Sequence, residues 1–348
     1  MLSEIPPGTS ETASPAGTRP GLPYPDTVTG IPAFPFPVGI VEWFMSGAAG
    51  IVLTMEWKRD WGLTLRLWMT GLLLLIVYLV FMAVLMMLGV SAIFVVLLAL
   101  VFGFIQFFFS DKMVLWSTGA KIVQEDEYPD LYRMVDRLRT EAGLPMPRIA
   151  IMTSPVPNAF ATGRGPNHAV VACTDSIMRM LNKDELEAVL AHELSHVKNR
   201  DILTMTVASF VAMIAAIIMQ NFLFAALFDR NNEGGVSAWI IVGLVSVVVY
   251  FIAQLLIMAI SRYREFAADR GSAYITRNPQ ALISALKKIS GRMEALPPEP
   301  KAKIEGANAF FIIPALTGNR ILELFSTHPA LEKRIANLEK VEGELRGY

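Results

Sequence analysis

The chain has 348 residues, of which 53% are hydrophobic and only 18% are charged, whereas roughly a quarter of the residues of a soluble domain are charged. This composition excludes a disordered, a collagenous or a simple soluble protein. The 30 Lys and Arg residues against 31 Asp and Glu residues give a net charge of -1, so the basic surplus that nucleic acid requires is lacking and no nucleic-acid partner is expected. The single cysteine, Cys173, cannot form an internal disulfide, which leaves histidines and carboxylates as candidate metal ligands.

The first 54 residues are predicted to be a Pro-rich extension. Residues 1–37 hold nine of the 21 prolines and have too little apolar surface to offset the entropy cost of ordering the chain, so disorder is expected there. Residues 38–54 are more apolar but contain Glu42 and three glycines, a pattern that could form an interfacial segment at the membrane. No cleaved targeting signal is evident, because no basic region precedes an apolar core.

Four stretches are long and apolar enough to cross a bilayer, whose core of about 30 Å takes roughly 20 helical residues. They cover about 68–88, 91–109, 203–228 and 236–260, and none contains a charged residue. These spans predict two transmembrane hairpins, in residues 55–110 and 203–261. Basic residues flank the outer ends of the spans, whereas the hairpin tips hold only Arg230. The positive-inside rule therefore predicts a multi-pass protein of the cell membrane, with both termini in the cytoplasm.

The polar sequence lies in two pieces, 111–202 and 262–348, which the second hairpin separates and which together could form one cytosolic domain. In the first piece, Pro129 starts a predicted helix that Gly143 ends. Three short β-like runs follow, with the sequences RIAIM, NAFAT and HAVVAC. Asn182 and Glu185 then form a predicted capping box at the start of a helix with an apolar face. The predicted fold is a mainly α membrane protein with four transmembrane helices and a cytosolic α+β domain that contains a small sheet.

The sequence AHELSH on this last helix is the pattern that indicates chemistry. His192 and His196 are four residues apart, so both imidazoles project from the same face of a helix toward one point. This spacing fixes two ligands of a tetrahedral zinc site. Glu193 is adjacent to the first ligand, where its carboxylate can take a proton from a water that the metal activates, as in H-E-x-x-H metallopeptidases.

A catalytic zinc site needs a third protein ligand and keeps the fourth position for water. Glu265 is the better candidate, because it follows the fourth span as His196 precedes the third. Two neighbouring antiparallel helices that continue unbroken out of the bilayer would bring these residues together within about 10 Å of the hydrocarbon boundary. Asp269 lies one turn further on and could accept the free N–H of a ligand histidine. The alternative is that both carboxylates pair with nearby arginines on a solvated face, and His168 is interpreted as a surface residue.

The chain resembles the HtpX-type membrane zinc endopeptidases from about Met55 to near its C-terminus. The resemblance rests on four motifs: PNAFATG at 157–163, DELEAVLAHELSHVKNRD at 184–201, SRYREFAAD at 261–269 and STHP at 326–329. It implies a zincin-like cytosolic domain with four transmembrane helices, one Zn²⁺ per chain held by His192, His196 and Glu265, and Glu193 as the general base. It also implies hydrolysis of peptide bonds in misfolded or damaged membrane proteins.

Further residues are candidates for activating or binding a substrate. His328 precedes a predicted helix and could donate a hydrogen bond to the oxyanion that forms on the peptide carbonyl, and Arg334 lies in the same helix. The family comparison favours both near the site, although a histidine at a helix start is otherwise ordinary. The NAFAT run is similar to the edge strand with which zinc endopeptidases bind an extended substrate, so backbone groups of Ala159 would pair with the peptide while Asn158 binds its main chain. The alternative is a plain core strand.

Two other functions are alternatives to a membrane-bound zinc endopeptidase. A prenyl-protein endopeptidase of the same superfamily resembles the chain mainly at the zinc motifs and encloses its site with more spans. A non-enzymatic membrane scaffold or transporter with a structural zinc would leave Glu193 without a purpose, and no charged residue inside a span marks a transport path. Such a structural site would also be closed by four protein ligands. The endopeptidase is therefore favoured, with polypeptides and the lipid bilayer as its partners.

Overall fold

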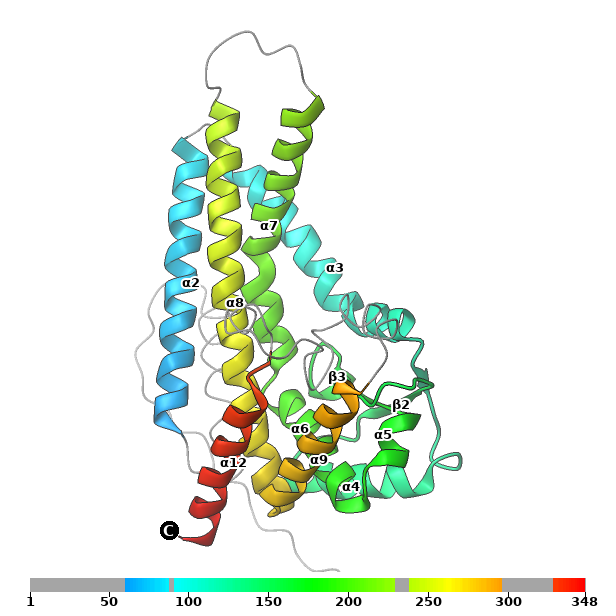
Figure 1. Ribbon diagram of the computed structural model, residues 1–348. Helices are drawn as coiled ribbons and strands as arrows, with labels where there is room; N and C mark the ends of the chain where they lie inside the picture. The colour runs from blue at the N-terminus through cyan, green and yellow to red at the C-terminus, as the bar shows by residue number, and fades with distance from the viewer. Residues whose placement is uncertain (1–59, 88–90, 229–237, 296–327, 348) are drawn as a thin grey trace, which may run out of the picture. The chain divides into compact units, whose positions relative to one another are not determined.

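The computed structural model of the chain describes residues 60–87, 91–228, 238–295 and 328–347, all of which belong to one compact unit (Figure 1). The predicted Pro-rich extension, with its segment 38–54, lies outside the described residues. The predicted tips of both hairpins and the first two residues of the STHP motif also lie outside them.

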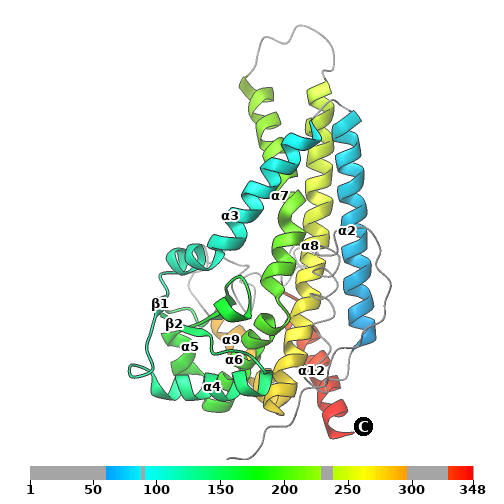
Figure 2. The ribbon, with the colours of Figure 1, turned by 180° about the vertical axis from the view of Figure 1, so that it is seen from behind.

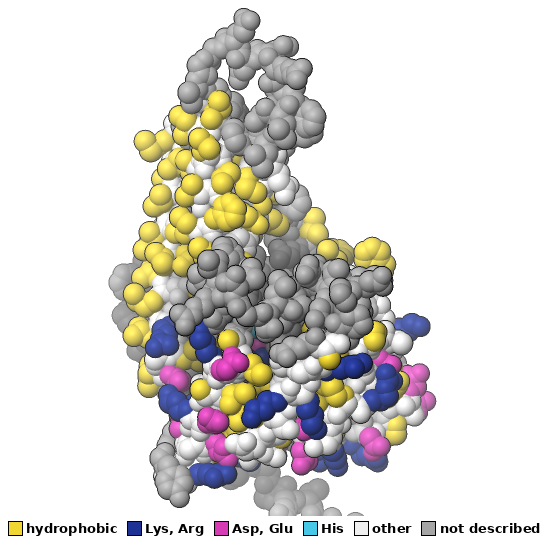
Figure 3. Space-filling view, in the orientation of Figure 1, with side chains coloured by type: hydrophobic (Ala, Val, Ile, Leu, Met, Phe, Trp, Pro, Cys, Tyr) yellow, Lys and Arg dark blue, Asp and Glu magenta, His cyan; other side chains and the backbone are white. Residues whose placement is uncertain are grey.

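Four long helices hold most of the apolar sequence: α2 (Trp61–Met87), α3 (Ala92–Thr118), α7 (Asp201–Phe228) and α8 (Ala238–Thr276). Helix α8 packs against both α2 and α7, and α3 contacts α7 (Figures 1 and 2). Phe81 of α2, Ile214 of α7 and Val242 of α8 belong to one buried apolar cluster between these helices. Many large apolar side chains on the outer faces are exposed instead, and Figure 3 shows them as a band that is separate from the charged side chains. Such a large exposed apolar surface suits a bilayer as its surroundings.

Three of the described helices are long and apolar enough to cross a membrane, over Trp61–Met87, Asp201–Gln220 and Ile240–Thr276. They coincide with the predicted first, third and fourth spans. The predicted second span lies in α3, which is not among these three. A mainly helical membrane protein is therefore confirmed, whereas the count of four spans stays a prediction.

A four-stranded sheet accompanies the long helices, with strands β1 (Lys121–Ile122), β2 (Arg148–Met152), β3 (Ala159–Thr162) and β4 (Val170–Thr174). The strand order is β1-β2-β4-β3; β2 and β4 are parallel, and each outer strand pairs antiparallel with its neighbour. The three predicted β runs are confirmed as β2, β3 and β4. The sequence does not predict β1, because two residues are too few for an alternating pattern.

Both faces of the sheet are covered. On one face, Ala150 and Phe160 pack against Val114 near the end of α3. On the other face, Ile149 and Val171 belong to a larger core. Six helices contribute to that core: α4 (Pro129–Ala142), α5 (Asp175–Met180), α6 (Lys183–Lys198), the C-terminal end of α8, α9 (Pro279–Glu294) and α12 (Leu331–Arg346). Strand β3 is at the edge of the sheet and contacts α6, so the helix with the AHELSH motif lies beside the edge strand.

The ends of α4 and α6 confirm the local signals in the sequence. Gly143 follows the last residue of α4 with a φ of 67°, a left-handed conformation that glycine adopts without strain. At the start of α6, the backbone N–H of Glu185 donates to the side chain of Asn182 at 2.9 Å, and the backbone N–H of Asn182 donates to the carboxylate of Glu185 at 2.9 Å. The predicted capping box is therefore present.

The helix that carries the two histidines does not continue into α7. It ends at Lys198, and Arg200 adopts a left-handed φ of 53° before α7 begins at Asp201. Helix α8, in contrast, runs unbroken through 39 residues. The expectation of two unbroken helices is therefore right for α8 and wrong for α6. The physical reason is the turn at Arg200, which redirects the chain and brings Asp201 back against His196.

Candidate metal centre

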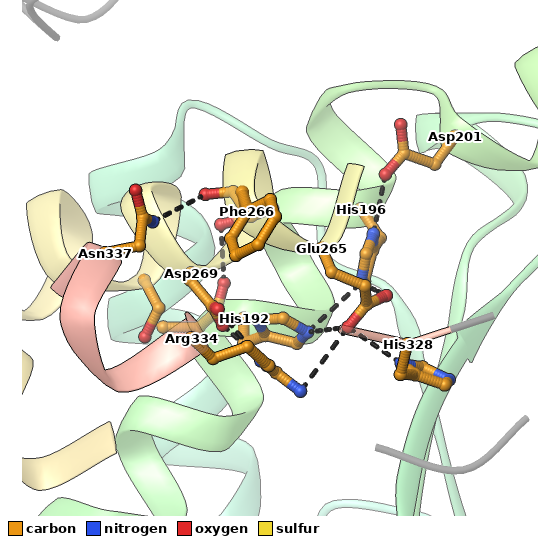
Figure 4. A network of polar contacts seen from close by, with 12 residues as sticks. His192, His196, Asp201, Glu265, Phe266, Asp269, His328, Arg334 and Asn337 are labelled. Carbon is orange, nitrogen blue, oxygen red and sulfur yellow. Dashed lines mark hydrogen bonds and ion pairs between the residues drawn. The ribbon is translucent and has the colours of Figure 1, made fainter. Parts of the chain in front are cut away.

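Helix α6 presents both histidines of its motif toward one point (Figure 4). The Nε2 atoms of His192 and His196 are 3.2 Å apart, and the two rings are perpendicular, with an interplanar angle of 90°. His192 is buried and His196 is partly exposed. One helical turn of separation thus produces the convergence that the spacing predicts.

Glu265 reaches the histidine pair from α8, which packs along α6. One oxygen of its carboxylate is 3.5 Å from Nε2 of His192, and the other is 3.3 Å from Nε2 of His196. Among the described residues, these three side chains form a group that could hold a metal ion, with ligand atoms within 4.8 Å of one another. Three protein ligands leave a coordination position for a substrate or water, as catalytic sites do.

Each histidine is oriented by a carboxylate on its other ring nitrogen. Nδ1 of His192 is 3.0 Å from Oδ1 of Asp269, and Nδ1 of His196 is 2.6 Å from Oδ2 of Asp201. A carboxylate only accepts hydrogen bonds, so for neutral histidines these contacts favour a proton on each Nδ1 and a lone pair on each Nε2, directed at the cluster. Two such lone pairs and a carboxylate at mutual distances of 3.2 to 3.5 Å repel one another unless a positive charge lies among them. The donor set therefore fits a cation, and its two imidazoles and one carboxylate suit zinc.

Each of these aspartates also pairs with an arginine. Arg334 of α12 makes two bonds to Asp269, from Nε at 2.9 Å and from a terminal nitrogen at 2.5 Å. Arg264 of α8 places its Nε 3.0 Å from Asp201. Each histidine thus belongs to a His–Asp–Arg series that holds its ring in place.

The sequence did not indicate the Asp201 contact. Asp201 is five residues after His196, a separation that an unbroken helix would not bring into contact. The one local feature that points to this contact is the position of Asp201 in the first turn of α7, directly after the break between α6 and α7.

The alternative of a solvated charged face does not match the surroundings of Glu265 and Asp269. Both carboxylates are buried. Arg264 pairs with Asp201, and Arg270 pairs with a glutamate of α12 at 2.5 Å. His168, in contrast, is exposed in a short 3₁₀ helix between β3 and β4, which confirms its interpretation as a surface residue.

The electrostatics of the centre raise the pKa of both histidines and of Glu193. Burial lowers the pKa of His196, but hydrogen bonds to Asp201 and Glu265 reverse this effect and raise it to about 10. The pKa of His192 is likewise raised, since Asp269 and Glu265 outweigh its burial. Burial raises the pKa of Glu193, although the neighbouring histidines act in the opposite direction. A carboxyl group with a raised pKa suits a residue that takes up and returns protons.

His328 and Arg334 approach the centre from the C-terminal part of the chain. Nδ1 of His328 is 3.0 Å from Oε2 of Glu265, and its side chain is buried. A terminal nitrogen of Arg334 is 3.5 Å from the same oxygen, while the rest of its guanidinium binds Asp269. The role of His328 in stabilising an oxyanion and the role of Arg334 in binding substrate stay predictions.

Strand β3 places the predicted substrate-binding residues along α6. Asn158 is buried, and its backbone exchanges two 2.9 Å hydrogen bonds with Thr174, from its N–H to the hydroxyl and from the Thr174 N–H to its carbonyl. Ala159 begins β3 and is in register with Cys173 of β4. Gly163 ends the strand with a φ of 118°, where a Cβ atom would lie 2.2 Å from a backbone oxygen. This end of the strand therefore requires glycine.

Comparisons with known proteins match the polar part and most of the remaining chain. Residues 125–342 match the family model described as peptidase family M48. Protease HtpX homolog 2 of Methanosarcina acetivorans is 54% identical over 292 residues, which cover 83% of this chain and 99% of that relative. Protease HtpX homolog of Moorella thermoacetica is 51% identical over 291 residues, which cover 82% of this chain and 96% of that relative. A crystal structure of S. mikatae Ste24p has a TM-score of 0.49 and 18% identity, and the match covers 79% of this chain and 67% of that one.

Proposed function

The chain belongs to peptidase family M48, and on this premise we propose that it is a membrane-bound, zinc-dependent endopeptidase. It is a metalloprotease, and the relatives named HtpX homologs confirm the resemblance that its motifs indicate. The observation that carries zinc dependence is the convergence of two Nε2 atoms and one carboxylate on a single point. His192, His196 and Glu265 would hold one Zn²⁺ there.

The bound ion would polarise the substrate carbonyl and make a water molecule more acidic. Glu193 accepts the proton of that water on its carboxylate and later donates it to the leaving amine. Asp269 and Asp201 keep a proton on each Nδ1, so that each Nε2 stays available as a ligand. His328 donates a hydrogen bond to the oxyanion that develops on the substrate.

The substrate would bind as an added strand beside β3. This strand is at the edge of the sheet and contacts the helix that carries Glu193. Backbone groups from Ala159 onward pair with the peptide, and Asn158 binds its main chain. Arg334, through Asp269 and Glu265, keeps the ligands aligned and contributes to the substrate-facing side of the site.

The position of Glu265 supports a metal close to the membrane. It lies five residues, or about 8 Å of helix, beyond the predicted end of the fourth span at Ile260, and α8 is continuous across this distance. With α3 as the second of four spans, the catalytic domain of residues 111–202 and 262–348 faces the cytoplasm. Misfolded or damaged membrane proteins would then be cleaved at the membrane surface.

The two alternatives receive less support. A scaffold or transporter with a structural zinc needs a fourth protein ligand, whereas the group found among the described residues has three. A prenyl-protein endopeptidase receives less support because the relatives at 51% and 54% identity are named Protease HtpX homolog.

The proposed function is tested by metal analysis and by cleavage of an unfolded protein in detergent. We expect about one zinc per chain and cleavage that a chelator abolishes. Glu193→Gln is the matched control, since it keeps the size of the side chain and removes the base; zinc should remain while hydrolysis falls by orders of magnitude. Full turnover by this variant, or a purified wild-type chain that holds zinc and cleaves nothing, would contradict the proposal.

A further inference from the structure

The exposed apolar face of α3 continues beyond the predicted end of the second span at residue 109. Exposed apolar side chains, mostly three or four residues apart, run along the whole helix: Ile93, Leu97, Leu100, Phe104, Phe108, Phe109, Met113 and Trp116. Trp116 is the most exposed of them, at 87%. From Ile93 to Trp116 the path along the helix is about 35 Å long, which exceeds the roughly 30 Å of a bilayer core, and Figures 1 and 2 show that its last turns bend away from the direction of the first turns.

The opposite face of these last turns is fixed to the catalytic part of the chain. Val114 is buried against Ala150, Phe160 and Val170 of the sheet. Figure 2 shows this end of α3 turning beside β1, and Ile122 of β1 is exposed as well. One side of the segment is therefore part of the protein core, while the other offers Phe109, Met113 and Trp116 to the surroundings. We call these three side chains the interfacial patch.

The residues around the interfacial patch are those that suit a lipid headgroup region. Tryptophan prefers the membrane–water interface, where its apolar ring and its N–H group are both accommodated. Nζ of Lys112 is 5.7 Å from the ring centre of Phe109, and the guanidinium of Arg164 is 5.3 Å from that of Phe108. Such side chains bury their apolar stems and keep their charges in water.

The charge around the patch is mixed, because Lys121 borders it while the acidic residues at 125–127 follow shortly after. Burial of apolar side chains, more than attraction to anionic lipid, should therefore supply the binding. The continuity of the stripe with the apolar surface of the same helix makes the bilayer, rather than a protein, its natural occupant.

We propose that the interfacial patch inserts into the headgroup region of the bilayer and anchors the catalytic sheet at the membrane surface. This inference rests on the membrane placement given above for the proposed function. Because Val114 and Phe160 share one core cluster, the anchor also fixes the height of β3, the proposed substrate-binding strand. Peptide segments that leave the bilayer would meet this strand without crossing bulk water.

A fluorescence experiment on the full chain in lipid vesicles tests the anchor. In a Cys173→Ala background, which removes the buried single cysteine, an environment-sensitive dye is attached at Met113→Cys or, separately, at Trp116→Cys. Leu79→Cys on the exposed face of α2 serves as the bilayer control. Asp130→Cys on α4, whose side chain is 94% exposed, serves as the aqueous control. The vesicles contain phosphatidylethanolamine and phosphatidylglycerol, with or without lipid that carries a nitroxide quencher.

Dyes at 113 and 116 should emit at shorter wavelength than the dye at 130, be quenched by nitroxide lipid, and be shielded from iodide. Iodide quenching at 116 and 113 equal to that at 130 would overturn the proposal. Shielding from both iodide and nitroxide lipid would also overturn it, because a protein would then cover the patch. The measurement does not use hydrolysis, so its outcome is independent of the peptidase assignment. A dye at position 79 that is exposed to water would disprove the membrane placement itself.

Discussion

Asp201→Asn is expected to weaken zinc binding even though Asp201 is not a ligand. Its carboxylate accepts the Nδ1 proton of His196 at 2.6 Å, a distance shorter than the 3.0 Å between Asp269 and His192. An asparagine keeps the shape but loses the charge, and its amide can rotate to donate to Nδ1, which would move the proton to Nε2 and block the ligand. Loss of such an orienting partner typically costs 10–100-fold in metal affinity, or about 1.4 to 2.7 kcal/mol.

Competition with a chromophoric chelator in detergent measures this loss directly. Asp136→Asn is the matched control, because Asp136 pairs with Arg139 on the exposed face of α4, and its zinc affinity should equal that of the wild type. The far-UV circular dichroism of both variants should be unchanged. Wild-type zinc affinity in Asp201→Asn would refute the reasoning, since it would mean that the Nδ1 contact does not orient His196.

Three further predictions follow from the same geometry. Glu265→Gln should largely empty the metal site, whereas Asp269→Asn should lower zinc affinity or activity by about 10–100-fold without abolishing it. Measurements of zinc content and of resistance to a chelator distinguish the two variants. A zinc-free Asp269→Asn variant would mean that the roles of ligand and orienting carboxylate are reversed between Glu265 and Asp269. Gly163→Ala should destabilise the protein by more than about 1 kcal/mol, because its Cβ would lie 2.2 Å from a backbone oxygen, whereas Gly165→Ala has open space and should be neutral in a thermal unfolding assay. Removal of residues 1–54 should leave membrane insertion and activity nearly unchanged, which fractionation and a cleavage assay would check.

The sequence predicts those features whose cause is local. The helical period is enough to converge His192 and His196, and a capping box or a glycine after a helix acts within a few residues. The partners of Asp269 are different, because Arg334 is 65 residues away in the chain and reaches it only through the packing of α12 on α8. The Asp201 contact depends on a left-handed Arg200, a conformation that is uncommon for a residue other than glycine and that no pattern in the sequence indicates.

The charges around the centre favour the binding of a dication. Four carboxylates and two guanidiniums of the described residues surround the histidines: Glu193, Asp201, Glu265, Asp269, Arg264 and Arg334. With neutral histidines and all four carboxylates ionised, this set has an excess of two negative charges, which is costly in a buried site. Without a metal, protons on His192 and His196 can supply the two missing charges, and this is the direction in which both pKa values are shifted. A zinc ion would supply the same two charges and release those protons, so the residues that raise the histidine pKa values would also favour a divalent cation over a monovalent one.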